Sequence, residues 1–352
     1  MAVQFMDSCD HYNQNTTILL KWNATGGSSV QSTPNGRNGR GLLMTPGNVS
    51  KSLTHQNGWV VGWAINLPTG AGGLGSDFYY KAAHAGETTL FSVYGETDGS
   101  ISLYAGNGRH TLLQNSGANG FFLKGGGIWY WFDVKYSLSG SSNISVTATF
   151  RVNTQVWCTG SGNTGINVND LLLQTATVNY HTFQASTGGN TYFDDFVIAD
   201  MSGSGTVNDF FGDTALSALF PDGDVKTDWN QSAAGSAFVL VNQQFPDNDS
   251  TYIYSDTVGD IENFTWQNTT VPPGGSIVAA HYGVFARKDA EGSRSFTQQS
   301  GPSAAPDFTS VAWYVGDTYA YYFTALDADP ATGVAWTESG FNATDFGQRL
   351  NS

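Results

Sequence analysis

Long stretches of this sequence alternate between apolar and polar residues, and this pattern restricts the fold more than any other feature. Apolar residues take the odd positions of Trp59–Leu67 and the even positions of Ile128–Leu138 and Ile144–Val152. A period of two places successive side chains on opposite faces of a β-strand. Because the turn-forming run Ser139–Asn143 separates the last two segments, we expect them to pair as an antiparallel hairpin.

A second hairpin is predicted between Thr89–Tyr94 and Ser100–Tyr104, since an Asp-Gly pair supplies the positive φ that a tight turn needs. Helical periodicity is scarce. Only Asp209–Leu219 and Asn342–Leu350 suit short helices, and neither is long enough to organise a domain. The pattern therefore predicts an all-β protein.

A Gly/Ser-rich run at 201–206 marks the predicted boundary between two domains. We expect an antiparallel β-sandwich over residues 1–200 and a separate β-rich domain over 206–352. Further predicted strands follow the run, among them Ala237–Val241 and Thr318–Leu326. A length of 352 residues accommodates two domains of ordinary size.

Charged residues are sparse and mostly acidic. They make up 12% of the chain, with 14 Lys and Arg against 29 Asp and Glu, for a formal net charge of −15. A surface that binds nucleic acid needs clustered cations, so we expect no nucleic-acid partner. The most apolar stretch, Trp59–Leu67, is much shorter than the roughly 20 residues that a membrane-spanning helix requires. We therefore expect no membrane insertion.

The two cysteines, Cys9 and Cys158, are interpreted from the expected compartment. The N-terminus carries Asp7 and Asp10 early and no basic region, so we expect no secretory signal. Reduced, buried thiols are then favoured, while a disulfide between the two remains an alternative.

Motifs for catalysis are scarce. A retaining glycosidase needs two carboxylates roughly 5 Å apart, and Glu96 with Asp98 is the nearest match. Both acids lie in a predicted turn, and Ser100 stands where a third acid would be expected, so we interpret the pair as a solvated turn. The 6 histidines show no zinc-type spacing, and neither a nucleophile elbow nor a phosphate-binding loop is found. The sequence predicts that the protein is not an enzyme.

Asp194, Asp195 and Asp77 are the candidate calcium ligands. Adjacent residues of a strand face opposite sides, so Asp194 and Asp195 cannot point into one pocket together. One of them could bind calcium at the sandwich rim, or accept backbone hydrogen bonds there. Asp77 ends a single copy of a calcium-binding repeat pattern, Gly72–Asp77, which by itself cannot complete an oxygen shell. We expect no cofactor, with calcium as the open alternative.

Trp129 and Trp131 lie on the face opposite the apolar stripe of their strand. Two indole rings on an outer surface could stack on a sugar or contact another subunit. Packing against a loop or against the second domain is the alternative.

Two groups of motifs resemble structural proteins of bacteriophage and prophage virions. The first resembles their N-terminal laminin-G or concanavalin-A-like sandwich, and consists of Phe5–Tyr12, Lys21–Trp22, Asn38–Leu42, Trp59–Trp63 and Tyr192–Val197. The second resembles the module that follows such sandwiches, and includes Asn208–Asp213, Leu219–Asp224, Asp249–Tyr252 and Asp329–Thr337. The resemblance implies a concanavalin-A-like antiparallel β-sandwich, or jelly roll, followed by a second β-rich domain.

The resemblance also implies a function. We expect a non-enzymatic virion protein on the capsid or tail surface, serving in decoration, at the tail tip or in attachment. It would be made in the cytoplasm of a bacterial host, form a homo-oligomer and contact other virion proteins. A glycan-binding adhesin that attaches to a host surface glycan is the alternative, followed by a polysaccharide depolymerase.

Overall fold

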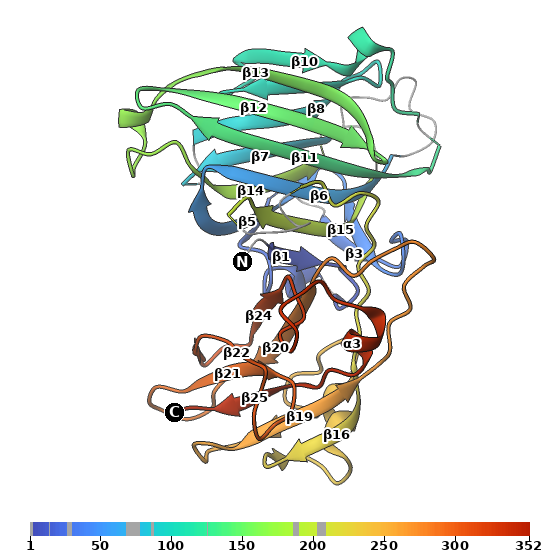
Figure 1. Cartoon of the computed structure of the whole chain (residues 1–352), viewed down its shortest axis with the longest axis vertical. Coiled ribbons are helices and arrows are strands. Elements are labelled where there is room, and N and C mark those ends of the chain that lie inside the picture. The colour runs from blue at the N-terminus through green and yellow to red at the C-terminus, as the bar shows by residue number, and fades with distance from the viewer. Residues whose placement is uncertain are drawn as a thin grey trace. The chain divides into compact units, whose positions relative to one another are not determined.

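The computed structural model describes residues 3–13, 15–26, 30–67, 78–85, 88–124, 126–185, 190–202 and 209–352. Within them the chain is almost entirely antiparallel β-structure, as predicted, and it forms two compact units, Met1–Leu216 and Ser217–Ser352 (Figure 1). The helices in the described part of the chain all lack the length and apolar character needed to cross a membrane.

Unit 1 is a sandwich of two antiparallel sheets, which overlie one another in Figure 1. The eight-stranded sheet contains, in spatial order, β13 (Gln155–Asn167), β12 (Asn143–Val152), β11 (Trp129–Ser139), β6 (Gly58–Asn66), β15 (Thr191–Asp200), β4 (Gly41–Met44) and β3 (Val30–Thr33), with β1 (Val3–Asp7) paired to β15. The seven-stranded sheet contains β10 (Thr111–Asn115), β9 (Ile101–Ala105), β8 (Thr88–Gly95), β7 (Phe78–His84), β14 (Val178–Ala185), β5 (Gly47–Gln56) and β2 (Ala24–Gly26). Short helical turns lie at α1 (Asn15–Ile18), Ser116–Asn119 and Val168–Asp170.

The inward faces of both sheets form one aromatic core. Trp63 of the eight-stranded sheet contacts Phe183 of the seven-stranded sheet edge-to-face, with ring centroids 5.3 Å apart. Phe132 packs against the same indole at 5.5 Å. All three rings are fully buried. Because the core-facing residues recur at every second position, alternation predicts this core correctly.

Both predicted hairpins are present. β11 pairs with β12 in the register Tyr136↔Ala148. β8 pairs with β9, and Gly99 in the turn between them has a φ of 89°. The alternation and the Asp-Gly turn were therefore sufficient to predict these local pairings.

The helix predicted at Asp209–Leu219 is wrong. The described residues 209–219 are irregular and extended, and Phe211 and Leu216 pack on the outer face of the eight-stranded sheet. Leu216 joins Ala64, Trp131 and Val197 in a small buried cluster. This packing explains why unit 1 continues to Leu216, beyond the predicted boundary at residue 200. The predicted linker at 201–206 lies partly outside the described residues.

Unit 2 is built on a six-stranded antiparallel sheet (Figure 1). Its strands are β16 (Pro221–Thr227), β19 (Ile261–Trp266), β25 (Phe346–Leu350), β21 (Ser295–Ser300) and β22 (Phe308–Thr309), with β23 (Trp313–Tyr314) paired to β21. Two small ladders join β20 (Ala280–Ala286) to β24 (Ala320–Leu326) and β17 (Asn230–Gln231) to β18 (Ile253–Tyr254). A cluster around Trp336 and Phe346 forms its core.

Two local predictions in unit 2 are wrong. Ala237–Val241, predicted as a strand, is helix α2, and its buried residues Ala237 and Leu240 are spaced as on one helical face. A short apolar run cannot distinguish helix from strand by periodicity. Asn342–Leu350, predicted as a helix, contains the end of α3 (Glu338–Asn342) and strand β25. Gly347 of β25 allows a close approach that strand pairing requires, because a Cβ there would lie 2.1 Å from the carbonyl oxygen of Glu262.

Candidate functional site

The outer face of the seven-stranded sheet carries aligned polar and aromatic side chains. Strand register places one row of residues directly opposite one another across six strands: Ser50, Thr182, Lys81, Ser92, Tyr104 and Leu112. The neighbouring row contains Asn48, Gln184, Tyr79, Tyr94, Ser102 and Asn115, two residues along each strand except β10, where a register shift makes the step three. We call Tyr79, Lys81, Tyr94 and Tyr104, the central part of these rows, together with Arg109 from the turn before β10, the tyrosine–cation face.

Alternation along the strands puts these side chains outside. Tyr80, Ala82 and Val93, which lie between them in the sequence, are fully buried in the sandwich core. Since successive side chains of a strand point to opposite faces, Tyr79, Lys81 and Tyr94 point away from the core. Tyr79 and Lys81 are half-buried, so each presents part of its side chain to solvent.

Three tyrosine rings form a continuous surface across β7, β8 and β9. The ring centroids of Tyr79 and Tyr94 are 5.3 Å apart, and those of Tyr94 and Tyr104 are 5.7 Å apart. Both separations lie within the range of favourable aromatic pairs. Neighbouring strands are about 4.8 Å apart, so the surface extends across the strands rather than along one of them.

Two cations lie over these rings. Nζ of Lys81 is 4.5 Å from the ring centroid of Tyr79. The guanidinium carbon of Arg109 is 4.2 Å from the centroid of Tyr94 and 5.4 Å from that of Tyr104. Attraction between a cation and the face of an aromatic ring is favourable at these distances. The rings therefore hold both positive charges at the surface of the sheet.

Glu96 borders this surface and fixes the position of Arg109. Its Oε2 accepts a hydrogen bond from Arg109 at 3.1 Å, and its Oε1 accepts one from the hydroxyl of Tyr104 at 3.4 Å. Arg109 has a φ of 63°, in the left-handed region, within the turn that precedes β10. Asp98 instead accepts hydrogen bonds from the backbone N–H and the hydroxyl of Ser100. Glu96 and Asp98 thus serve different local partners.

Burial moves the pKa values of the tyrosines and the lysine in opposite senses. It raises the pKa of Tyr79 to about 12, with a further contribution from nearby Tyr94. It lowers the pKa of Lys81. Burial also raises the pKa of Tyr94, an effect that the charge of Arg109 partly offsets. A protonated hydroxyl and a more acidic ammonium group therefore lie next to each other.

The tryptophans selected from the sequence lie on the other sheet. Trp131 is only 1% exposed and packs against Leu216 and Phe211, so it offers no ring surface to a sugar. Gly62 allows this packing, because a Cβ there would lie 2.5 Å from the indole. Trp129 is partly buried against the same cluster. Both residues therefore take the loop-packing role that the sequence analysis had set out as the alternative.

Asp194 and Asp195 occupy a bulge in β15, where Asp195 has a φ of 52°. Asp194 Oδ2 accepts a hydrogen bond from the backbone N–H of Arg37 at 2.7 Å, and Asp195 Oδ1 accepts one from that of Leu216 at 2.9 Å. Both carboxyl groups are almost fully buried. Burial raises the pKa of each. These contacts attach two loops to the sandwich.

Calcium binding stays a prediction. Asp77 lies outside the described residues. Across the described ranges, no three His, Cys, Asp or Glu side chains are grouped so that they could hold a metal ion.

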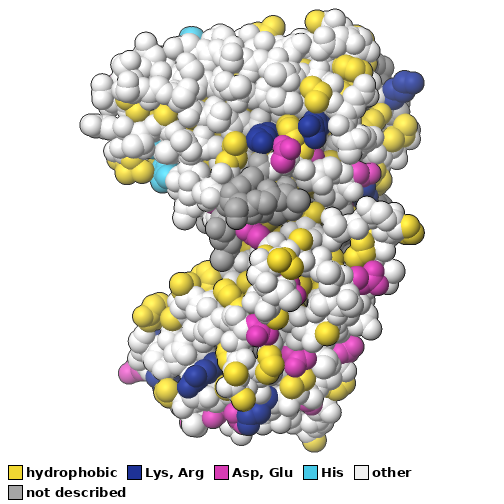
Figure 2. Space-filling model, in the orientation of Figure 1, with side chains coloured by type: hydrophobic (Ala, Val, Ile, Leu, Met, Phe, Trp, Pro, Cys, Tyr) yellow, Lys and Arg dark blue, Asp and Glu magenta, His cyan; other side chains and the backbone are white. Residues whose placement is uncertain are grey.

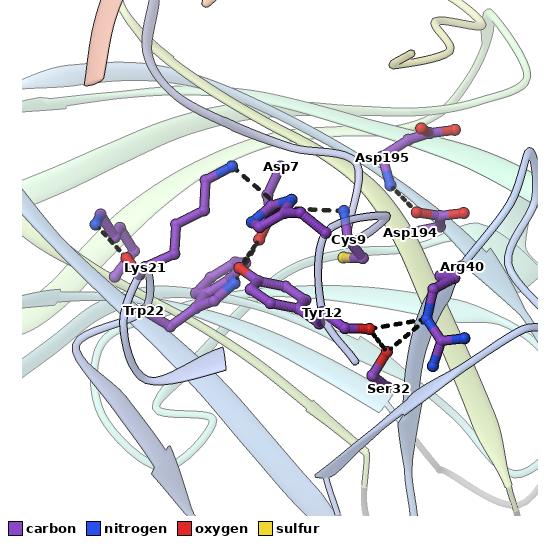
Figure 3. Close-up of polar contacts among 11 residues, drawn as sticks. Asp7, Cys9, Tyr12, Lys21, Trp22, Ser32, Arg40, Asp194 and Asp195 are labelled. Carbon is purple, nitrogen blue, oxygen red and sulfur yellow. Dashed lines mark hydrogen bonds and ion pairs between the residues drawn. The ribbon is translucent and has the colours of Figure 1, made fainter. Parts of the chain in front are cut away.

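Another buried carboxylate, that of Asp7, anchors the N-terminal strand (Figure 3). Asp7 Oδ2 accepts hydrogen bonds from the hydroxyl of Tyr12 at 2.6 Å and from the indole of Trp22 at 2.7 Å, and Oδ1 accepts one from Lys21 at 3.2 Å. The backbone N–H of Cys9 donates to Oδ1 at 3.0 Å. With every direction of the carboxylate occupied, this cluster is structural.

The face of unit 1 shown in Figure 2 has few charged side chains, in line with the low charge of the chain. Because charged side chains are few, two cations close together, such as Lys81 and Arg109, indicate a candidate binding surface. The sequence analysis searched for acid pairs and tryptophans, and it missed the tyrosine–cation face. The available signal was the presence of Tyr79, Lys81, Tyr94 and Tyr104 at the polar positions of alternating strands.

Neither a family model nor a curated protein matches the sequence. Similar solved structures include a marine PL-14 alginate lyase from Aplysia kurodai, with 11% identity, a TM-score of 0.42, and coverage of 57% of this chain and 100% of that chain. Alginate lyase Aly36B has 11% identity and a TM-score of 0.39, covering 55% of this chain and 96% of its own. Basic winged bean lectin, solved with Tn-antigen, has 10% identity and a TM-score of 0.36, covering 56% of this chain and 98% of its own. At such identities the likeness concerns the sandwich fold alone.

These neighbours correct two predictions made from the sequence. They are named as polysaccharide lyases and lectins, and they contradict the expected role as a non-enzymatic structural protein of a phage virion. The neighbours named as lyases also count against the prediction that the chain is not an enzyme, although a likeness of fold assigns no activity by itself. The antiparallel jelly-roll-like sandwich is confirmed.

Proposed function

We propose that the tyrosine–cation face binds an acidic polysaccharide. The observation that carries the proposal is the placement of Lys81 and Arg109 over three adjoining tyrosine rings on one open sheet face. A tyrosine ring stacks on the apolar face of a sugar, and its hydroxyl exchanges hydrogen bonds with sugar hydroxyls. The two cations supply the attraction for carboxylates along the polymer.

Lys81 is the better placed of the two cations. In the part of the chain that the structure describes, no carboxylate forms an ion pair with it, whereas Arg109 is paired with Glu96. Its ammonium group therefore pairs with a ligand carboxylate without first breaking a salt bridge. The guanidinium of Arg109 would donate hydrogen bonds both to Glu96 and to a carboxylate of the polymer.

Binding is tested by affinity electrophoresis in gels that contain polygalacturonate, alginate or a neutral glucan. We expect retardation by at least one acidic polymer and none by the neutral glucan. Lys81→Met should weaken retardation about tenfold, since one charge-assisted contact is lost. Lys124→Met, a change at an exposed lysine outside the tyrosine–cation face, is the matched control. Equal retardation of both variants would refute the proposal.

Cleavage of the bound polymer is the second candidate function, favoured by the opposite pKa shifts of Lys81 and Tyr79. Neighbouring groups whose environments separate their pKa values suit acid–base work. For this reaction Arg109 would hold the uronate carboxylate, and the fraction of Lys81 that is deprotonated would take the proton on the carbon α to it. The electron pair then forms a carbon–carbon double bond as the glycosidic oxygen leaves, and Tyr79 protonates that oxygen.

This second function predicts a new ultraviolet absorbance from the conjugated double bond of the unsaturated product. Tyr79→Phe should lower the rate of its appearance and leave retardation in the gel nearly unchanged. If retardation occurs without any new absorbance, the face binds the polymer and does not cleave it.

A further inference from the structure

Unit 2 contains a cavity of about 310 Å³ on one face of its six-stranded sheet. The wall combines polar side chains with three small apolar surfaces. Its lining includes Ile261, Thr297, Gln299, Ala304, Pro306 and Arg349. The volume suits a ligand of about the size of one sugar unit.

Strand register explains the floor of this cavity. Arg349 of β25 lies between Ile261 of β19 and Thr297 of β21, so the three side chains share one face. In the adjoining row, Gln299 is opposite Gly347.

Two turns with glycines in the left-handed region form the rim. Gly301, with a φ of 87°, begins the loop that carries Ser303, Ala304 and Pro306, and its N–H donates to the carbonyl of Asp345 at 2.9 Å. Gly259, with a φ of 100°, donates to the carbonyl of Leu350 at 2.9 Å. Backbone hydrogen bonds thus hold both edges in place.

Gln299 points to a ligand. Its residue is only 2% exposed, and the buried Nε2 has no hydrogen-bond partner among the residues that the structure describes. Leaving a buried amide without a hydrogen-bond partner is unfavourable. A polar ligand atom in the cavity would supply the missing partner.

Arg349 sets the charge of that ligand. Its side chain is exposed, and no carboxylate of the described residues forms an ion pair with it. The cavity wall contains no Asp or Glu. The planar guanidinium matches a carboxylate in a two-point contact. The chain has a net charge of −15, so cations are few. An Arg349 side chain without an ion-pair partner in the described residues, in the same cavity as the Gln299 amide, therefore favours an anionic ligand.

We propose that this cavity binds a single carboxylate-bearing sugar unit. Arg349 pairs with the carboxylate, the Gln299 amide contacts a hydroxyl, and Ile261 and Pro306 contact the apolar ring face. The site is separate from the tyrosine–cation face and does not depend on the function proposed for it.

The test is calorimetric titration of the full chain with glucuronate, glucose and inorganic phosphate. We expect saturable binding of glucuronate, with glucose and phosphate each at least about tenfold weaker. Arg349→Met should weaken glucuronate binding about tenfold. Gln299→Leu should also weaken it, which keeps the test decisive if the arginine variant fails to fold.

A control variant separates this site from other sources of binding. Arg294→Met removes a cation outside the cavity, whose guanidinium donates to the carbonyl of Ser293, and should leave affinity unchanged. The proposal is overturned if glucuronate does not bind, if glucose or phosphate binds as tightly, or if Arg349→Met has no effect.

Discussion

Lys81 lies over the ring of its neighbour Tyr79, with Nζ 4.5 Å from the ring centroid. The two residues are separated by one position on β7, so both point out of the sandwich while Tyr80 between them is buried in the core. Strand geometry alone therefore places a cation on an aromatic ring at the surface. Arg109 repeats the arrangement on Tyr94.

Salt should weaken polysaccharide binding at this face. Exposed charges are screened over about 8 Å at physiological ionic strength and about 3 Å at 1 M. We expect affinity for an acidic polymer to fall steadily between these conditions, and to fall less steeply in Arg109→Gln, which lacks one of the two cations. Affinity electrophoresis at several salt concentrations measures both slopes. An affinity independent of salt would show that the cations do not contact the polymer.

Asp7→Asn should destabilise unit 1. Burial alone would raise the pKa of Asp7. The nearby charges of Lys21 and His11 and the hydrogen bond from Tyr12 together lower it by more, so the pKa lies below its usual value. The buried carboxylate thus contributes stability at neutral pH, which is lost as the pH falls through this lowered pKa. The amide variant leaves Lys21 without its charge partner, at a cost of about 3–5 kcal/mol.

Urea unfolding at neutral pH measures this loss for Asp7→Asn. Asp170→Asn, at an exposed carboxylate of the same unit, should change the free energy of unfolding by less than about 0.5 kcal/mol. Similar effects of the two substitutions would contradict the anchoring role of Asp7.

Asp133 should make unit 1 less stable as the pH rises. It is fully buried beneath the segment 209–216, and its Oδ2 accepts a hydrogen bond from the N–H of Gly212 at 2.9 Å. Burial raises its pKa to about 7. A raised carboxyl pKa means that the folded state binds the proton more tightly, so stability is greatest below about pH 4 and declines up to about pH 7.

This concerns the contribution of Asp133 alone, which is opposite in sign to that of Asp7. Asp133→Asn imitates the protonated carboxyl and should remove this part of the pH dependence. Urea midpoints at pH 5 and pH 8 should then differ less in the variant than in the parent chain. A larger difference in the variant would show that Asp133 is charged in the folded protein.

Cys9 and Cys158 should resist alkylation until the protein unfolds. Both are free and buried. Burial raises the pKa of Cys9 and raises that of Cys158 to about 12, so neither forms the reactive thiolate near neutral pH. Mass spectrometry should show no adduct after treatment of the native protein and two adducts after treatment in denaturant. Recovery of a disulfide, or rapid labelling of the native protein, would contradict this.

The functional face was harder to predict than the fold. Alternation indicates that Tyr79 and Lys81 share a face with each other, and that Ser92 and Tyr94 share one. It does not indicate that β7 and β8 pair with Tyr79 opposite Tyr94. The sequence also could not show that Trp131 would be covered by Phe211 and Leu216, because those residues follow it in the chain by many positions.

The sequence by itself determined the strands, the nearest-neighbour hairpins and the apolar core of unit 1. These features depend on the two-residue period and on the residue types in the turns. Both signals come from residues that are close together in the sequence. Only the tertiary structure decided which strands bring the tyrosine rings together, which carboxylates are buried, and that Gln299 and Arg349 line the same cavity. Those outcomes depend on contacts between segments that are distant in sequence, for which strand periodicity contains no information.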